Sequence, residues 1–194
     1  MPTVLVFTIF QCLWAIWWLC LHLRIRKNRS YATDRKAVHT NLFYQIVSPL
    51  LYLMQNGLCL ASFWSNSPWL LKFHDSDICR SLGFLLFFFG SNLYFWALLH
   101  LGKNYSPCYD SHLPSAIVRT GPYQWIRHPM YGAKLLIGLA TIIVSGSLWF
   151  VPTILYFFGV TIRSMLREEA QLRQLAPGYI EYQARTKMIV PWIG

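Results

Sequence analysis

The chain has 194 residues, of which 55% are hydrophobic, 17% aromatic and 12% charged, and its mean hydropathy is +0.37. Soluble domains carry about 25% charged residues, so this composition excludes a disordered chain, a coiled coil and a secreted disulfide scaffold, and predicts an integral membrane protein. The net charge is +10. Because the basic residues flank apolar runs, they indicate cytoplasmic loops rather than nucleic-acid binding.

Apolar runs predict an all-α fold with five transmembrane helices, at 4–23, 42–64, 82–101, 129–144 and 148–162. The first run carries no formal charge and is long enough to cross about 30 Å of hydrocarbon. The first two spans therefore lie within 4–64. The fourth run is short, reaching only about 24 Å. A turn at 145–147 joins it to the fifth, so the last two runs are expected to form a helical hairpin.

The basic residues also predict the orientation of this single membrane domain, 1–194. With five spans, fifteen Lys and Arg fall in inside segments and two, Lys72 and Arg80, fall outside. This bias places the loop at 102–128 and the C-terminal tail in the cytoplasm, at the plasma membrane or the endoplasmic reticulum. The five cysteines show no CxxC or zinc-ligand spacing, so we expect buried thiols and no metal site.

The first motif with chemical content is Arg127-His128-Pro129. Proline suits the first turn of a helix, so Arg127 and His128 are expected just before a helix N-terminus. Free backbone N–H groups at that end attract a carboxylate or phosphate. The alternative is an interfacial cluster that contacts lipid headgroups.

Two adjacent acids mark the helix that continues the fifth run. Glu169 and Arg173 form an i,i+4 pair, which predicts a solvated pair on the exposed face. Glu168 has no such partner, and an acid near hydrocarbon is costly unless it is paired. A cationic ligand such as an α-ammonium group would pair it.

A helix break at 176–178 precedes Tyr179 and Tyr182, which share one face of a short helix or serve as an interfacial aromatic belt. In order along the chain, the motifs are Gly-Pro-Tyr at 121–123, Arg-His-Pro-Met-Tyr at 127–131, Glu168-Glu169, then Tyr179, Tyr182, Arg185 and Pro191. This set resembles the isoprenylcysteine carboxyl methyltransferase family, within the wider group of membrane phospholipid methyltransferases. The resemblance covers 102–194, about half of the chain, which would carry the cytoplasmic loop, the hairpin and the tail that form the site.

The resemblance implies a methyltransferase that uses S-adenosylmethionine at the cytoplasmic membrane surface. It implies that the cofactor contacts Ser115, Ala116, Ile117, Val118, Tyr123, His128, Pro129, Met130, Tyr131 and Glu168. The family's substrate-facing arginine falls on Ser164 here, flanked by Arg163 and Arg167. The candidate catalytic residues are therefore Arg127, Arg163, Arg167 and Glu168.

The methyl acceptor is expected to be lipophilic, most simply the carboxylate of an isoprenylcysteine-like group. A carboxylate with a pKa of roughly 4 is ionised at pH 7, so its methylation needs positioning and exclusion of water but no general base. The first alternative is a phospholipid amine, which would need a base such as His128 or Glu169. The second is a small membrane scaffold without enzymatic activity, which predicts no S-adenosylmethionine binding.

Overall fold

The computed structural model describes residues 71–73, 76–105 and 116–189, together with isolated positions between 12 and 61. The first two predicted spans lie almost entirely outside the described residues, as do Ser115 and Cys108. The described elements are all helical: α3 (Asp77–Leu101), η2 (Gly102–Asn104), η3 (Gly121–Gln124), α4 (Pro129–Ser145), α5 (Phe150–Leu175) and α6 (Tyr179–Arg185). Within these ranges, α3 is the one helix that is both long and apolar enough to cross a membrane, and α4 is apolar but shorter. The prediction of five spans remains a prediction.

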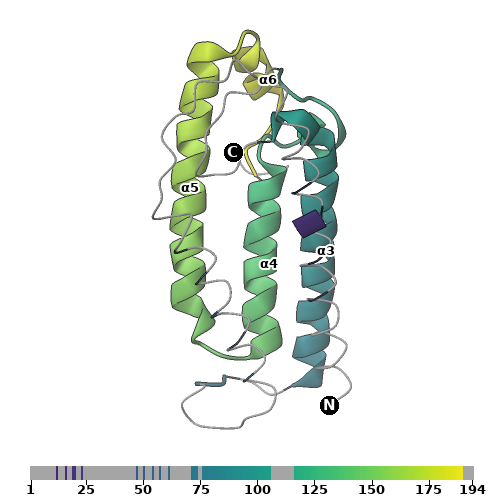
Figure 1. Cartoon of the computed structure of the whole chain (residues 1–194), viewed down its shortest axis with the longest axis vertical. Helices are drawn as coiled ribbons and strands as arrows, with labels where there is room; N and C mark the ends of the chain where they lie inside the picture. The colour runs from purple at the N-terminus through teal and green to yellow at the C-terminus, as the bar shows by residue number, and fades with distance from the viewer. Residues whose placement is uncertain are drawn as a thin grey trace.

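Three long helices stand side by side in alternating directions (Figure 1). α3 and α4 pack closely because Gly83 and Gly90, seven residues apart on one face, present no side chain to α4. A Cβ atom on Gly83 would lie 2.8 Å from Val144, and one on Gly90 would lie 3.3 Å from the carbonyl oxygen of Ala133. Small residues are what allow helix backbones to approach this closely.

The helix boundaries follow from local signals. Ser76 caps α3 by accepting a hydrogen bond from the backbone N–H of Cys79, so the helix begins five residues before the predicted run. Gly146 ends α4 in the left-handed conformation, with φ of 65°, which glycine adopts without steric cost. This turn lies at the end of the molecule where Phe73 N donates to Gly146 O at 2.8 Å.

The opposite end collects the polar motifs. There α3 ends, η3 leads into the start of α4, and α6 folds back from the end of α5 (Figure 1). The helix break between α5 and α6 is the predicted one. The buried core below this end contains Tyr94, Phe95, Leu98, Tyr123 and Met130. The fold therefore rests the candidate site on a packed aromatic layer.

Candidate functional site

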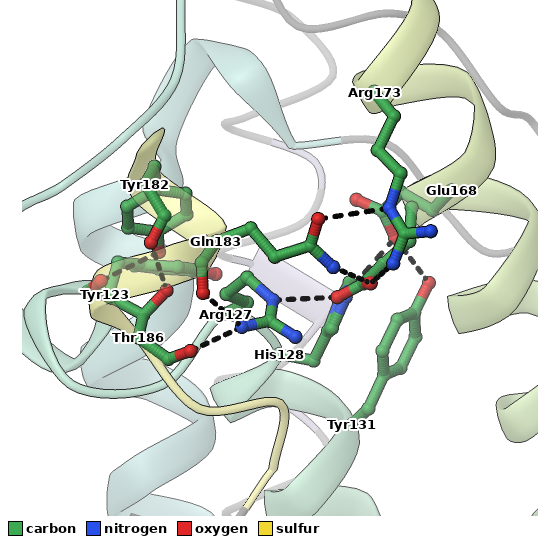
Figure 2. A network of polar contacts seen from close by, with 10 residues as sticks. Tyr123, Arg127, His128, Tyr131, Glu168, Arg173, Tyr182, Gln183 and Thr186 are labelled. Carbon is green, nitrogen blue, oxygen red and sulfur yellow. Dashed lines mark hydrogen bonds and ion pairs between the residues drawn. The ribbon is translucent and has the colours of Figure 1, made fainter. Parts of the chain in front are cut away.

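The buried Glu169 carboxylate is the centre of a polar network, and its partners Arg127, His128, Gln183 and Arg173 are labelled in Figure 2. Its residue is 2% exposed. Oε1 accepts from Arg127 Nε at 2.7 Å and lies 3.2 Å from His128 Nε2. Oε2 accepts from Gln183 at 3.0 Å and from Arg173 at 3.3 Å. Segments more than forty residues apart in the sequence are thus joined by one carboxylate.

The prediction that Glu169 sits on an exposed, solvated face is therefore wrong. Its pair with Arg173 exists, but the apolar stripe of α5 continues through Met165, Glu169 and Leu172, all of them buried. Burial raises the pKa of Glu169. Hydrogen bonds from His128 and Arg127, with the charge of Arg127, outweigh burial and lower that pKa to about 2. Glu169 is therefore an anion in the folded protein.

Arg127 holds the C-terminal tail against the start of α4. Its Nη1 donates to the carbonyl oxygens of Gln183 and Thr186. The backbone continues this contact, since Arg127 N donates to Lys187 O at 2.8 Å and His128 N donates to Met188 O at 3.0 Å. The predicted catalytic arginine is thus engaged in internal contacts, which is the geometry of a positioning residue.

Glu168 differs from Glu169 in being partly exposed. Its side chain is 44% exposed, and Oε2 accepts from Tyr131 Oη at 3.0 Å. Oε1 has no hydrogen-bond partner within the described part of the chain. The predicted juxtaposition of His128, Tyr131 and Glu168 is present. One carboxylate oxygen is left without a donor among the described residues.

His128 bridges the two acids. A carboxylate can only accept, so the hydrogen bond to Glu169 assigns a proton to Nε2. The other nitrogen, Nδ1, lies 3.9 Å from Glu168 Oε2. His128 therefore presents Nδ1 toward the open acid while its other edge is fixed by the buried one.

The ring of Tyr131 already contacts two side chains of the protein. The His128 ring stacks on it at 5.4 Å with an interplanar angle of 27°, and Lys134 Nζ lies 5.3 Å from the ring centroid. The first turn of α4 also offers fewer donors than the sequence implied, because the N–H groups of Tyr131 and Gly132 both bond to His128 O at 3.1 Å. Pro129 and Met130, predicted cofactor contacts, are buried.

The segment at 116–119 lies against α6. Ile117 packs on the cluster of Leu172, Tyr179 and Tyr182, and Val118 packs on the core around Tyr94. Ala116 is exposed. Arg119 fixes the segment by donating to Gly178 O at 3.1 Å. The structure thus brings part of the predicted cofactor segment to the helix that covers the site.

Tyr123 is buried, and its carbonyl oxygen accepts from Tyr182 Oη at 2.7 Å. Burial, followed by the nearby charge of Glu168, raises the pKa of Tyr123. By contrast, Arg163 and Arg167 are exposed on α5 and make no hydrogen bond or ion pair within the described residues. They stay outside the network that gathers the other site residues.

Gln183 and Thr186 contribute to the network from α6 and from the residue after it, and neither was predicted from the sequence. The hydrogen bonds of both depend on how α6 folds back, which no local pattern specifies. The burial of Glu169 did leave a signal, because it lies four residues after Met165 and three before Leu172. Among the described residues, no group of three or more His, Cys, Asp or Glu side chains could hold a metal ion.

A family model described as phospholipid methyltransferase matches residues 78–175. The chain belongs to this family. The matched region runs from α3 to the end of α5 and includes both acids and the 127–131 motif. It stops before α6, so the family match leaves Gln183 and the tyrosines of α6 uncovered.

The fold is similar to that of a solved structure, the eukaryotic intramembrane Ras methyltransferase isoprenylcysteine carboxyl methyltransferase without a monobody. The TM-score is 0.52 and the identity 21%, over 80% of this chain and 55% of that one. The chain thus spans about half the length of that protein. No curated protein sequence matches significantly.

Proposed function

We propose that the chain is an S-adenosylmethionine-dependent methyltransferase that acts on a lipophilic acceptor at a membrane surface. The observation that carries this proposal is the open Glu168, fixed by Tyr131 and facing His128 Nδ1 beside a buried and fully bonded Glu169. A half-exposed acid with one unbonded oxygen suits an ammonium group. Membership of a methyltransferase family supports the same chemistry.

The residues present fit the cofactor. When bound, S-adenosylmethionine supplies an electrophilic methyl group on a sulfonium. Glu168 would pair with its α-ammonium group, and the segment at 115–118 would line its nucleoside. His128, Pro129, Met130 and Tyr131 would lie between these two parts. Arg127 and Glu169 would act indirectly, by fixing His128 and holding the tail across the site.

The first candidate acceptor is an isoprenylcysteine-like carboxylate. Its chemistry requires in-line positioning of the carboxylate oxygen and exclusion of water. Arg163 and Arg167 lie on α5 within the two turns before Glu169, and their guanidinium groups are free of contacts in the described structure. Either could orient a carboxylate. Likeness in fold to an isoprenylcysteine carboxyl methyltransferase supports this candidate.

A second candidate, a phospholipid amine, is favoured by one specific feature. An amine must lose a proton before or during its methylation, and His128 Nδ1 beside Glu168 is an arrangement that could accept it. The description of the family model also names phospholipid methylation. Both candidates place the protein in a membrane as a multi-pass protein with its site facing the cytoplasm, which the distribution of basic residues supports.

Methyl transfer from labelled S-adenosylmethionine to an isoprenylcysteine and to phosphatidylethanolamine, measured from pH 6 to 9, tests the proposal. We expect product with the isoprenylcysteine and a rate that is flat over this range, because a carboxylate titrates far below it. A rate that rises with pH, with product from the phospholipid, would favour the second candidate. Labelled product from neither acceptor, with no cofactor binding, would favour a non-enzymatic scaffold.

A further inference from the structure

Tyr179 is the first residue of α6 and is buried. The residue is 2% exposed, and its Oη has no hydrogen-bond partner in the described structure. Tyr179 forms a buried cluster with Leu172 and Tyr182, and its ring meets that of Tyr182 edge-on, at 5.9 Å and 61°. The ring is thus well packed, while the polar atom at its tip is unsatisfied.

The neighbouring Tyr182 differs from Tyr179 in that its hydroxyl is hydrogen-bonded. Tyr182 lies three residues later on the same buried face, and its hydroxyl donates to Tyr123 O at 2.7 Å. Buried hydroxyls are nearly always bonded in this way, because an unpaired one loses its bonds to water and gains none. A phenylalanine at 179 would fill the same space without that cost. The hydroxyl of Tyr179 therefore calls for a partner other than the described residues, and a bound ligand would supply one.

The surroundings of Tyr179 indicate what kind of group that partner is. The cluster is apolar apart from its tyrosine hydroxyls, and Ile117, which packs against it, belongs to the segment at 116–119. Burial raises the pKa of Tyr179 well above its ordinary value; the charge of Glu169 raises this pKa further, and the charge of Arg127 lowers it. The phenol is thus protonated and donates. Among the described residues, the two acids near the hydroxyl, Glu168 and Glu169, outnumber the one nearby cation, Arg127, so an uncharged acceptor fits better than an anionic one.

We propose that the Tyr179 hydroxyl donates a hydrogen bond to the nucleoside of the bound cofactor. The inference rests on the proposed function and adds a residue from α6 to the site. The Glu168 carboxylate would then hold the charged end of the ligand, and α6 its uncharged end. Ile117 and Leu172 supply the apolar surface beside the purine or ribose.

The test compares Tyr179→Phe with the matched variant Tyr182→Phe, using full-length protein in detergent. Affinities for S-adenosylhomocysteine and for adenosine are measured by titration calorimetry, with adenosine in competition format. We expect Tyr179→Phe to weaken both ligands by the same factor, roughly tenfold. Its melting temperature without ligand should stay unchanged or rise. Tyr182→Phe, which breaks a hydrogen bond that is present, should lower the melting temperature by roughly 2–4 °C.

Three outcomes would overturn this inference without affecting the proposed function. Unchanged affinities in Tyr179→Phe would mean that the ligand does not use the hydroxyl. A lower melting temperature without ligand would reveal a partner within the protein. A loss for S-adenosylhomocysteine but not for adenosine would assign the hydroxyl to the amino-acid end. Failure of the wild-type protein to bind either ligand would instead refute the proposed function, and with it the inference.

Discussion

Replacing Glu169 by glutamine should destabilise the protein far more than replacing Glu168. The lowering of the Glu169 pKa from 4.5 to about 2 corresponds to about 3 kcal/mol of stability at neutral pH. Glutamine removes the charge and leaves Arg127 buried without its counterion, and breaking a buried pair costs about 3–5 kcal/mol. For a chain of this length, about 3 kcal/mol lowers the melting temperature by about 6–12 °C.

Glu168→Gln is the matched control, because it is the same substitution one residue away. Glu168 is half-exposed, and a glutamine oxygen can still accept from Tyr131. Its melting temperature without ligand should stay within about 2 °C of wild type. Thermal unfolding in detergent, followed by circular dichroism at pH 7, measures both.

The lowered pKa of Glu169 also determines how the stability of the fold depends on pH. Because folding lowers the pKa of Glu169, its contribution is fully present above about pH 4.5 and is lost as pH falls toward about 2. Between these two pH values, the free energy of unfolding of Glu169→Gln should therefore fall less than that of wild type. Equal melting temperatures for the two variants, or a Glu169→Gln protein that melts like wild type, would refute the network as the stabilising element.

Gly121→Ala should lower the free energy of unfolding by at least about 1–3 kcal/mol, because φ is +60° and the new Cβ would lie 2.5 Å from the His100 ring. Adding His100→Ala should restore only the part of this loss that is due to the clash. Full restoration by the double variant would exclude backbone strain as a cause. Arg127→Lys should loosen the tail, because a lysine cannot reproduce the contacts of the guanidinium fork, and trypsin should cleave the tail faster than in wild type; an unchanged rate would contradict its holding role. Arg163→Ala or Arg167→Ala should raise the KM for a carboxylate acceptor by about tenfold without changing S-adenosylhomocysteine affinity, and an equal effect on an amine acceptor would argue against carboxylate recognition.

Local signals predicted much of the helical framework. The run at 129–144 corresponds to α4 (Pro129–Ser145), with proline in its first turn, and the break at 176–178 separates α5 from α6. Proline, glycine and apolar periodicity act over a few residues, so a single sequence is enough to recognise them. The start of α3 was missed because the cap by Ser76 lies outside the apolar run.

The environment of the two adjacent acids could not be predicted in the same way. The i,i+4 arginine made Glu169 look like a solvated surface acid, whereas Glu168, which lacks such a partner, was expected to pair with a ligand. Its burial depends on Arg127 and His128, about forty residues earlier, and on Gln183 from a helix that folds back. Such contacts are set by tertiary packing, so spacing alone placed Glu169 on the wrong face of the helix.

Titration calorimetry with S-adenosylhomocysteine tests the central claim, that Glu168 holds the ammonium end of the cofactor. The proteins are wild type, Glu168→Gln and Glu181→Gln, the last an equal change of charge at an exposed position of α6. We expect wild-type binding, a loss of about ten- to a hundredfold for Glu168→Gln, and no change for Glu181→Gln. No heat of binding for wild type at millimolar ligand, or equal losses in both variants, would contradict the claim.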